Sequence, residues 1–525
     1  MTTTRTKTRP GTVTFVGGGP GDPGLLTLRA VEALATADVV ALSRPSLDAV
    51  LAHCSAEVDV IDTSCEDAGA GKQIVAAAKA GRAVVRVFAG DPTVLCAFAE
   101  EAEACAKAKI AFELVPGISA AIAVPAYAGI PVTDKRTRNV HIVDVSPHGP
   151  EPDWAAASEP HQTLVLLDCG GSVGKAAAAL VEHGRRGDTP IAVTSDGTTR
   201  GQRTIVSTLD TVERDAASMD GQVTAVVGEV VKLREKLSWW ESRPLFGWKV
   251  LVPRTKEQAA ALSGQLVSYG AIPVGVPTIA VEPPRTPQAV DRAIRGLVSG
   301  RYAWLALTSV NAVKAIREKI EELGLDARAL AGVKVACVGE QTAAAMQEWG
   351  IRSDLVPSGE QSSEGLLADW PDFEQGYDAL DRVLLPRADI ATETLAAGLV
   401  ERGWQVDDVT AYRTVRAAPP PAETREAIKT GGFDAVLFTS SSTVRNLVGI
   451  AGKPHASSII AVIGPQTAKT AQELGLRVDV MAEVASASSL AEGLAGFGRQ
   501  RRESGEIHPP GKANKAKAVA RAKRK

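Results

Sequence analysis

The chain has 525 residues, enough for three or four domains of ordinary size that each bury a core. Its 45% hydrophobic and 23% charged residues, with only 4% aromatic residues, are typical of globular α/β layers, and no apolar run is long enough to span a membrane. The net charge is −3 although residues 507–525 carry seven Lys or Arg and no acid, so the body of the chain is acidic and nucleic acid is excluded as its main partner.

The first residues lack the apolar segment of a signal peptide, which predicts a cytoplasmic protein. The six cysteines are scattered, with no Cys-x-x-Cys pair and no neighbouring histidine cluster. They are Cys54, Cys65, Cys96, Cys105, Cys169 and Cys337. This spacing argues against a zinc site or a disulfide framework, so we expect no metal and mostly buried, reduced thiols.

A glycine-rich turn follows the first strand-like run. Residues 16–22 read Val-Gly-Gly-Gly-Pro-Gly-Asp, and a helix is expected to begin near Gly24. Consecutive glycines let main-chain amides approach a ligand closely, and a helix N-terminus adds free N–H groups. The dinucleotide fingerprint is incomplete because Asp22 stands where it would continue, so a nicotinamide site is disfavoured. The turn alone fits a structural role as well as a ligand-binding one.

Residues 11–238 alternate short β-branched runs with Ala-rich amphipathic segments, which predicts an α/β domain in two lobes. The predicted strands are 12–16, 39–42, 83–88, 140–145, 163–167, 191–194 and 224–227. The predicted helices are 25–36, 73–80 and 174–183. A basic helical stretch, 231–237, ends before Pro244, and a second α/β block follows.

The second block contains an internal repeat, in which strands with their following turns recur at nearly equal offsets. The paired segments are 252–254 with 385–387, 308–313 with 439–444, and 338–343 with 463–468. We therefore expect duplicated modules whose ligand lies beyond the carboxyl ends of the strands. Two facing lobes would form a cleft of hydroxyls and helix N-termini, suited to a ligand with many carboxylates. The same hydroxyls also fit ordinary helix N-caps.

Five ordered motifs in the first block resemble the tetrapyrrole methylase family, in particular uroporphyrinogen-III C-methyltransferase. The motifs occupy residues 16–22, 90–92, 115–121, 126–131 and 196–198. The resemblance implies that S-adenosylmethionine binds between two lobes. By position, it assigns the cofactor contacts to Pro20, Ala89, Gly90, Asp91, Val94, Ser119, Ala120 and Gly197. Methylases of this kind commonly dimerise, so a homodimer through this domain is left open.

The positions that this family uses for chemistry and substrate binding differ here. Ser43 stands where the family carries an acid, and the family lysine falls on Thr63 or Ser64. Ala97 replaces an arginine able to pair with substrate carboxylates. Cofactor positions therefore match the family better than substrate positions, which leaves methylation of the usual substrate in question.

Residues 248–497 resemble uroporphyrinogen-III synthase, whose two lobes are joined by a two-stranded link. That enzyme cyclises hydroxymethylbilane by loss of a hydroxyl and ring closure, which require a proton donor and a polar cleft but no metal or organic cofactor. Tyr412 matches the family tyrosine proposed to assist this loss, and it equally fits a half-buried strand tyrosine. The residues that match the cleft turns are Thr308, Ser309, Asn311, Thr439, Ser440, Ser441, Gly464 and Thr467. Arg387 joins the substrate-binding set because it and Arg254 are placed to steer propionates, although both also fit surface turns.

The predicted domains are a flexible N-terminus (1–10), a methylase-like domain (11–238), a linker (239–247), a synthase-like domain (248–498) and a basic disordered tail (499–525). The leading hypothesis is a bifunctional enzyme that makes uroporphyrinogen III and methylates it toward precorrin-2. Its partners would be small-molecule tetrapyrroles, without nucleic acid or membrane. Two alternatives stay open: a monofunctional synthase with a cofactor-binding scaffold domain, and a non-enzymatic tetrapyrrole carrier.

Overall fold

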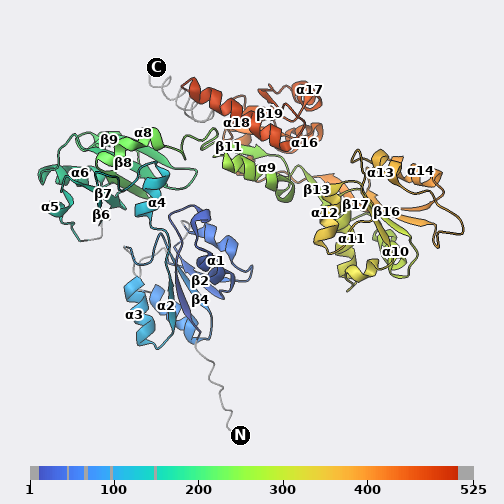
Figure 1. The fold of residues 1–525 in the computed structure, drawn as a ribbon, viewed down its shortest axis with the longest axis horizontal. Coiled ribbons are helices and arrows are strands. Elements are labelled where there is room, and N and C mark those ends of the chain that lie inside the picture. The colour runs from blue at the N-terminus through green and yellow to red at the C-terminus, as the bar shows by residue number, and fades with distance from the viewer. Residues whose placement is uncertain (1–10, 44–46, 64–68, 95–97, 147–149, 506–525) are drawn as a thin grey trace, which may run out of the picture. The chain divides into compact units, whose positions relative to one another are not determined.

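The computed structural model describes residues 11–43, 47–63, 69–94, 98–146 and 150–505 (Figure 1). The predicted flexible N-terminus (1–10), Ser64, Cys65, Cys96, Ala97 and residues 506–525 of the predicted basic tail lie outside the described residues. The chain divides into two compact units, Met1–Lys249 with Gly264–Pro273 and Ala491–Lys525, and Val250–Ser263 with Val274–Leu490. Among the described helices, none has the length and apolar character needed to cross a membrane.

The first unit begins with a five-stranded parallel sheet in the order β3-β2-β4-β1-β5. Its strands are β1 (Val13–Gly17), β2 (Val39–Leu42), β3 (Asp59–Asp62), β4 (Val84–Phe88) and β5 (Phe112–Val115). Phe15 and Val39 pack into the core on one face, and Val16 and Val40 pack into the core on the other. Burial on both faces explains why these strands read as nearly continuous apolar runs. The helices of this lobe are α1 (Leu28–Ala35), α2 (Ala70–Lys79) and α3 (Phe98–Lys107), with 3-10 helices η1 (Pro23–Leu25) and η2 (Asp48–His53).

The helix expected from near Gly24 begins later than predicted. Residues Pro23–Leu25 form only a 3-10 turn, in which the Asp22 carboxylate accepts the Gly24 N–H at 2.9 Å. Such a side-chain bond competes with regular helix. The α-helix starts at Leu28, after Thr27 caps it by accepting the Ala30 N–H at 3.2 Å. The free N–H groups of α1 therefore follow Thr27 and are not part of the glycine turn.

The second sheet of this unit has the order β6-β7-β10-β8-β9, in which only β6 and β7 are parallel. Its strands are β6 (Asn139–Asp144), β7 (Gln162–Leu167), β8 (Pro190–Ser195), β9 (Arg203–Thr208) and β10 (Val223–Val227). The helices are α4 (Ala120–Tyr127), α5 (Trp154–Ala157), α6 (Val173–Glu182), α7 (Val212–Asp215) and α8 (Arg234–Leu237), with η3 (Glu229–Leu233). All seven strands predicted in this block are present, and β3, β5 and β9 are additional.

The second unit contains two sheets, β12-β11-β18-β19-β20 and β13-β17-β16-β14-β15. The strands of the first are β11 (Lys249–Val252), β12 (Ile272–Gly275), β18 (Ala435–Phe438), β19 (Ile459–Val462) and β20 (Val480–Met481). Those of the second are β13 (Ile279–Glu282), β14 (Trp304–Leu307), β15 (Lys334–Cys337), β16 (Arg382–Ala388) and β17 (Gln405–Arg416). The helices from residue 256 onward are α9 (Lys256–Ser268), α10 (Pro287–Val298), α11 (Val310–Glu322), η4 (Ala327–Leu330), α12 (Glu340–Glu348), α13 (Ser363–Asp369), α14 (Thr394–Glu401), α15 (Ala422–Thr430), α16 (Ser441–Ala451), α17 (Pro465–Glu473) and α18 (Ala487–Glu503). Residues 264–268 of α9 and 491–503 of α18 belong to the first unit.

The repeated segments occupy matching places in these two sheets. β11 lies beside β18, with β19 next, just as β16 lies beside β14, with β15 next. Each sheet therefore combines strands from both halves of the sequence repeat. The end of β17 pairs antiparallel with β13, from Glu282 opposite Arg413 to Ile279 opposite Arg416.

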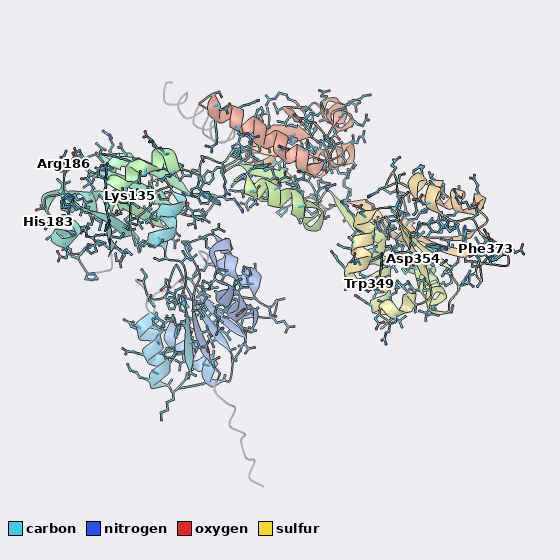
Figure 2. The ribbon with its side chains drawn as sticks, viewed as in Figure 1. Lys135, His183, Arg186, Trp349, Asp354 and Phe373 are labelled. Atoms are coloured by element: carbon cyan, nitrogen blue, oxygen red, sulfur yellow. The ribbon has the colours of Figure 1, made fainter. Side chains whose placement is uncertain are left out.

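Side-chain contacts extend the sheet that contains β14 and β15 at its β15 edge. The Asp354 carboxylate accepts the Val335 N–H of β15 at 2.7 Å, and Trp349, labelled with Asp354 in Figure 2, packs against the core on β14 and β15. This chain segment thereby continues the edge of the sheet beyond β15.

Strand β11 comes from the first half of the sequence repeat and pairs with β18 of the second half, and it offers a test of this arrangement. Leu251 of β11 is fully buried in a core with Val436 and Phe438 of β18. Leu251→Ala should lower the free energy of unfolding of this lobe by about 2–5 kcal/mol, because it leaves a cavity. The measurement is thermal melting, with Val298→Ala as the control because that side chain is 52% exposed. Equal melting temperatures for the two variants would contradict the buried position of β11.

Candidate functional site

Four loops of the first unit meet at one place, and we call them the loop cluster: residues 17–22, 89–94, 116–119 and 196–199. The first three follow β1, β4 and β5, which are neighbours in a parallel sheet. Their carboxyl ends therefore lie at one edge, where ligands of open α/β sheets bind. The fourth loop follows β8 of the second sheet.

Four glycines let these loops touch through their backbones. A Cβ on Gly117 would lie 2.2 Å from the Gly90 carbonyl oxygen, and one on Gly17 would lie 2.4 Å from the Gly117 Cα, so neither position has room for a side chain. Gly19 and Gly90 form a two-way bridge, with N–H to oxygen distances of 3.3 and 2.8 Å, and both have positive φ. Glycine adopts that conformation without steric cost. The glycines thus bring one loop against another, where the sequence suggested room for a ligand.

Asp91 ties two of the loops together. Its Oδ1 accepts the Thr93 N–H and its Oδ2 accepts the Gly117 N–H, both at 2.8 Å. Burial acts to raise the pKa of this carboxyl, but the hydrogen bonds from Thr93 and Gly117 outweigh burial and lower the pKa below 3.8. Asp91 is therefore an ionised structural tie within the loop cluster.

The fourth loop is held against the first. The Asp22 N–H donates to Thr198 Oγ1 at 3.0 Å, and the Tyr127 hydroxyl donates to Asp22 Oδ2 at 3.1 Å. Asp196 and Thr198 have φ values of 49° and 66°, a left-handed conformation that costs free energy in residues other than glycine. Between them, Gly197 lies against Val124, which a Cβ would meet at 2.5 Å.

The structure gathers the residues predicted to contact the cofactor. A Cβ on Gly90 would lie 3.6 Å from both Ser119 Cα and the Ala120 N, and one on Gly21 would lie 3.0 Å from the Gly197 oxygen. Ser119 also caps α4 by accepting the Ala121 N–H. The remaining members differ in exposure: Pro20 is buried, Val94 is half-buried and Ala89 is exposed. The residues are assembled as expected, and their contact with a cofactor stays a prediction.

Near this cluster, Ser43 faces Thr63 and a buried ion pair. Ser43 Oγ lies 3.4 Å from Thr63 Oγ1, which accepts a hydrogen bond from Arg86 at 2.8 Å. Arg86 in turn binds Glu101 with Nε 3.0 Å from Oε2, and both side chains are 9% exposed. Arg86 is not among the site residues predicted from the sequence, although an arginine inside the apolar run of β4 is the signal of a buried polar network.

The second unit holds a cavity of about 1090 Å³ that contains part of the predicted synthase site. Its walls include the turn between β14 and α11, the start of α12, the middle of β17 and residues just after β11. The polar side chains among them include Arg254, Thr308, Ser309, Asn311, Lys314, Gln341 and Tyr412. Three carboxylates, those of Glu282, Glu318 and Glu322, also line the cavity, so its wall carries charges of both signs. Hydroxyls, amides and charged groups around a wide cavity suit a polar ligand that makes many hydrogen bonds.

Tyr412 and Ser309 form the polar centre of this cavity. Tyr412 is only 6% exposed, and its Oη lies 2.9 Å from Ser309 Oγ. Ser309 Oγ also accepts the Ala312 N–H at 3.1 Å as the N-cap of α11, so its position is set by the helix. The hydroxyl is thus the helix cap that the sequence allowed and also the partner of Tyr412, while its contact with a ligand stays a prediction.

The predicted substrate-binding residues that follow β18 and β19 do not line the cavity and make other contacts. Ser440 forms a capping box with Thr443, and Ser441 donates to the Gln466 carbonyl at 3.1 Å. Gly464 and Thr467 are buried, and Thr439 Oγ1 is buried with no partner among the described residues. Among the described residues that line the cavity, none comes from this group.

Arg387 is likewise turned away from the cavity. It is 8% exposed, and its guanidinium binds Asp408, Glu393 and the Thr392 carbonyl. Two carboxylates already neutralise this cation, so steering of propionates by Arg387 has no support in its surroundings. Arg254, in contrast, lines the cavity, and burial lowers its pKa.

Comparisons with known proteins agree with this division. Residues 12–213 match the family model of tetrapyrrole (corrin/porphyrin) methylases, and residues 260–492 match that of uroporphyrinogen-III synthase HemD. The porphyrin biosynthesis protein HemD of Ruminiclostridium josui is 32% identical over 93% of this chain and 98% of its own. Siroheme synthase 1 of Klebsiella pneumoniae is 37% identical over 44% of this chain and 51% of its own. A uroporphyrin-III C-methyl transferase of Thermus thermophilus, solved with S-adenyl homocysteine, has 28% identity and a TM-score of 0.38 over 42% of this chain and 100% of its own.

The chain belongs to the family of the porphyrin biosynthesis protein HemD, in which a tetrapyrrole methylase domain precedes a uroporphyrinogen-III synthase domain. It is an enzyme of tetrapyrrole biosynthesis, as the leading sequence hypothesis held.

Asp91 gives the loop cluster a characteristic pH dependence. Because the folded-state pKa is lowered, Asp91 contributes its full stability above pH 3.8 and loses it as the pH falls through the lower folded value. Asp91→Asn should therefore destabilise the first unit by about 1–2 kcal/mol near pH 7, from weaker hydrogen bonds. The melting-temperature difference from wild type should shrink below about pH 4. A difference that grows in acid would contradict an ionised tie.

Proposed function

We propose that the cavity around Tyr412 converts hydroxymethylbilane to uroporphyrinogen III. The observation that carries this proposal is the Tyr412–Ser309 pair, a buried phenol held at 2.9 Å from a helix-capping hydroxyl inside a cavity of about 1090 Å³. The family assigns this reaction to the same part of the chain. A tetrapyrrole with a carboxylate on each side chain is the class of ligand that such a cavity can take.

In this proposal, Tyr412 donates a proton to the hydroxyl that leaves the bilane. The carbon–oxygen bond breaks with its electron pair on oxygen, and water departs. The resulting cation is attacked by the substituted α-carbon of the last pyrrole, and the bond from that carbon to the neighbouring methylene then breaks. The methylene bonds instead to the other α-carbon of the same pyrrole, which loses a proton, so the last pyrrole is inverted as the type III isomer requires. Ser309 holds the phenol in place, Thr308 and Asn311 bind the substrate, and Arg254 meets a carboxylate. In this proposal, no step needs an organic cofactor or metal.

Removal of the phenol hydroxyl tests this role. Tyr412→Phe should lower the rate of uroporphyrinogen III formation by roughly a hundred-fold, which is the lower end of the range for general acids. Chromatography of the product isomers provides the measurement, since uncatalysed closure gives the type I isomer. Tyr302→Phe is the matched control: that tyrosine packs in the same core and bonds Asp407 at 2.7 Å without lining the cavity. A wild-type rate for Tyr412→Phe would move the proton to water or to another hydroxyl.

We propose that the loop cluster binds S-adenosylmethionine through Pro20, Ala89, Gly90, Asp91, Val94, Ser119, Ala120 and Gly197. The gathered polar groups are backbone amides and one serine hydroxyl as donors and a carboxylate as acceptor, and they fit the polar ends of this cofactor. When bound, it supplies a methyl group to an electron-rich pyrrole carbon. The protein must hold uroporphyrinogen III in line with that methyl and accept the proton that the carbon then loses.

The acceptor of that proton is the weak point of the methylase site. Ser43 and Thr63 are neutral, and Arg86 beside them is paired with Glu101. Ser43→Asp should therefore raise transfer of labelled methyl groups to uroporphyrinogen III about ten-fold or more, as a restored general base. Ser43→Asn, of nearly the same shape, should leave the rate unchanged. Equal rates for both variants would show that this position does not limit turnover.

Two further properties belong to the proposal. A homodimer is supported by exposed apolar side chains along and around the edge strand β5, namely Leu28, Phe112, Leu114, Ile118 and Ile122. A cytoplasmic location is supported by free thiols at Cys54, Cys105, Cys169 and Cys337, which suit a reducing compartment. Thr439, Ser440, Ser441, Gly464 and Thr467 stay candidates for substrate contact, with structural roles of their own.

A further inference from the structure

We propose that Trp240 and Glu241, in the segment that the sequence suggests is a linker, are positioning residues of the S-adenosylmethionine site. This inference rests on the proposed methylase function and adds the element that holds its loops in shape. It starts from the turn 196–199, where Asp196 and Thr198 have left-handed φ values of 49° and 66°. Such a backbone persists only when its surroundings hold it.

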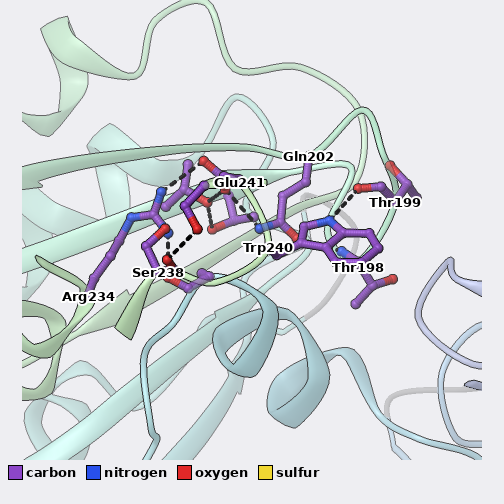
Figure 3. Close-up of polar contacts among 11 residues, drawn as sticks. Thr198, Thr199, Gln202, Arg234, Ser238, Trp240 and Glu241 are labelled. Atoms are coloured by element: carbon purple, nitrogen blue, oxygen red, sulfur yellow. Dashed lines mark hydrogen bonds and ion pairs between the residues drawn. The ribbon is translucent and has the colours of Figure 1, made fainter. Parts of the chain in front are cut away.

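Trp240 binds that turn directly, and Glu241 binds it through Gln202 (Figure 3). The Trp240 indole N–H donates to the Thr199 carbonyl at 2.9 Å. Glu241 Oε1 accepts the Gln202 amide N–H at 2.8 Å, and Gln202 Oε1 accepts the Thr198 N–H at 2.7 Å. Thr198 and Thr199, which follow Gly197, are thus both tied to the adjacent residues Trp240 and Glu241.

The side chains that make these hydrogen bonds are buried, so the bonds are shielded from water. Trp240 is 6% exposed, Gln202 is 3% exposed and Thr198 is fully buried. Glu241 is also bound by Thr204 at 2.6 Å and by Arg234 at 2.8 Å, with side-chain exposures of 17% for Glu241 and 14% for Arg234. Three hydrogen-bond donors fix the position of this buried carboxylate, and the carboxylate in turn fixes the position of the Gln202 side chain.

The same segment reaches the first loop of the cluster by a second route. The Trp240 ring lies 4.8 Å from the Tyr127 ring, and Tyr127 donates its hydroxyl to Asp22. Burial and the Asp22 carboxylate raise the pKa of Tyr127 to about 12, so this hydroxyl stays a donor at neutral pH. Asp22 is also bonded to Thr198 through its N–H.

These contacts close a ring that runs from Trp240 through Thr199, Thr198, Asp22 and Tyr127 back to Trp240. Two loops from different sheets of the methylase, 17–22 and 196–199, are set against each other by this ring. Arg243 completes it by lying over the Trp240 ring at 4.2 Å. The segment after residue 238 is therefore part of the methylase site.

The neighbouring tryptophan provides a matched control. Trp239 also donates its indole N–H, at 3.0 Å to the Ala126 carbonyl, and stacks on Tyr127 at 5.1 Å. It is 45% exposed, and its hydrogen bond ends on α4 rather than on the turn 196–199. Trp239→Phe and Trp240→Phe thus each remove one indole donor and keep an aromatic ring.

The test measures S-adenosylhomocysteine binding to the full chain by calorimetry. Trp240→Phe should weaken binding about five- to ten-fold, as expected for one lost buried hydrogen bond, whereas Trp239→Phe should change it less than two-fold. With uroporphyrinogen III as methyl acceptor, Trp240→Phe should raise KM for S-adenosylmethionine more than it lowers kcat. A role confined to stability would lower the melting temperature and leave these affinities unchanged.

Glu241→Gln provides an independent arm, since it keeps the size of the side chain and removes its charge; it too should weaken binding. The thermal melting transition of each variant reports whether its first unit, which contains Trp240 and Glu241, is folded. If wild-type protein does not bind S-adenosylhomocysteine, the proposed methylase function fails. If wild-type protein binds it and Trp240→Phe and Glu241→Gln bind equally well, the positioning role is wrong.

Discussion

Parallel pairing between strands that are far apart in the sequence determines where the candidate site residues lie. In the first unit, β1 lies between β4 and β5, so three loops separated by many residues end at one edge of a sheet. In the second, β16 joins β14 to β17, and this pairing brings Ser309 to Tyr412. Without these ladders, neither group of residues would be assembled.

The groups that build both sites also hold the fold. Ser309 caps a helix and meets Tyr412, and Asp91 joins two loops while it stands among the proposed cofactor residues. A cap of this kind stabilises a helix by about 1 kcal/mol, which is reason enough for a hydroxyl at that place. Structure and function are therefore not alternatives for these residues, and a variant at either position must be examined for both.

Much of the architecture could be predicted because the central strands are buried on both faces and are apolar throughout. The strands β3, β5 and β9 were missed because they are largely exposed edge strands, such as β3 with Asp59 and Asp62 at its ends. The start of α1 was misplaced because a side-chain bond of Asp22 made a separate turn. Motif order predicted three loops of the cluster, because three of the motifs follow β1, β4 and β5, which are neighbours in one sheet.

Long-range polar contacts could not be predicted in this way. Trp240 and Glu241 read as a linker because an aromatic, charged stretch before a proline has no periodicity, and their partners lie near residues 199–204. The repeat suggested that both halves contribute alike to the synthase cavity, yet Ser309 lines it and Ser440 does not. Ser309 and Ser440 occupy equivalent positions and both cap a helix, but of the two only Ser309 lies beside a tyrosine.

The claim that one chain makes and then methylates a tetrapyrrole is tested most directly by one reaction mixture. The purified protein is given hydroxymethylbilane and S-adenosylmethionine labelled in its methyl group, with no other enzyme present. The label should enter a macrocycle of the type III isomer series. Unlabelled type I isomer as the only macrocyclic product would contradict both activities at once.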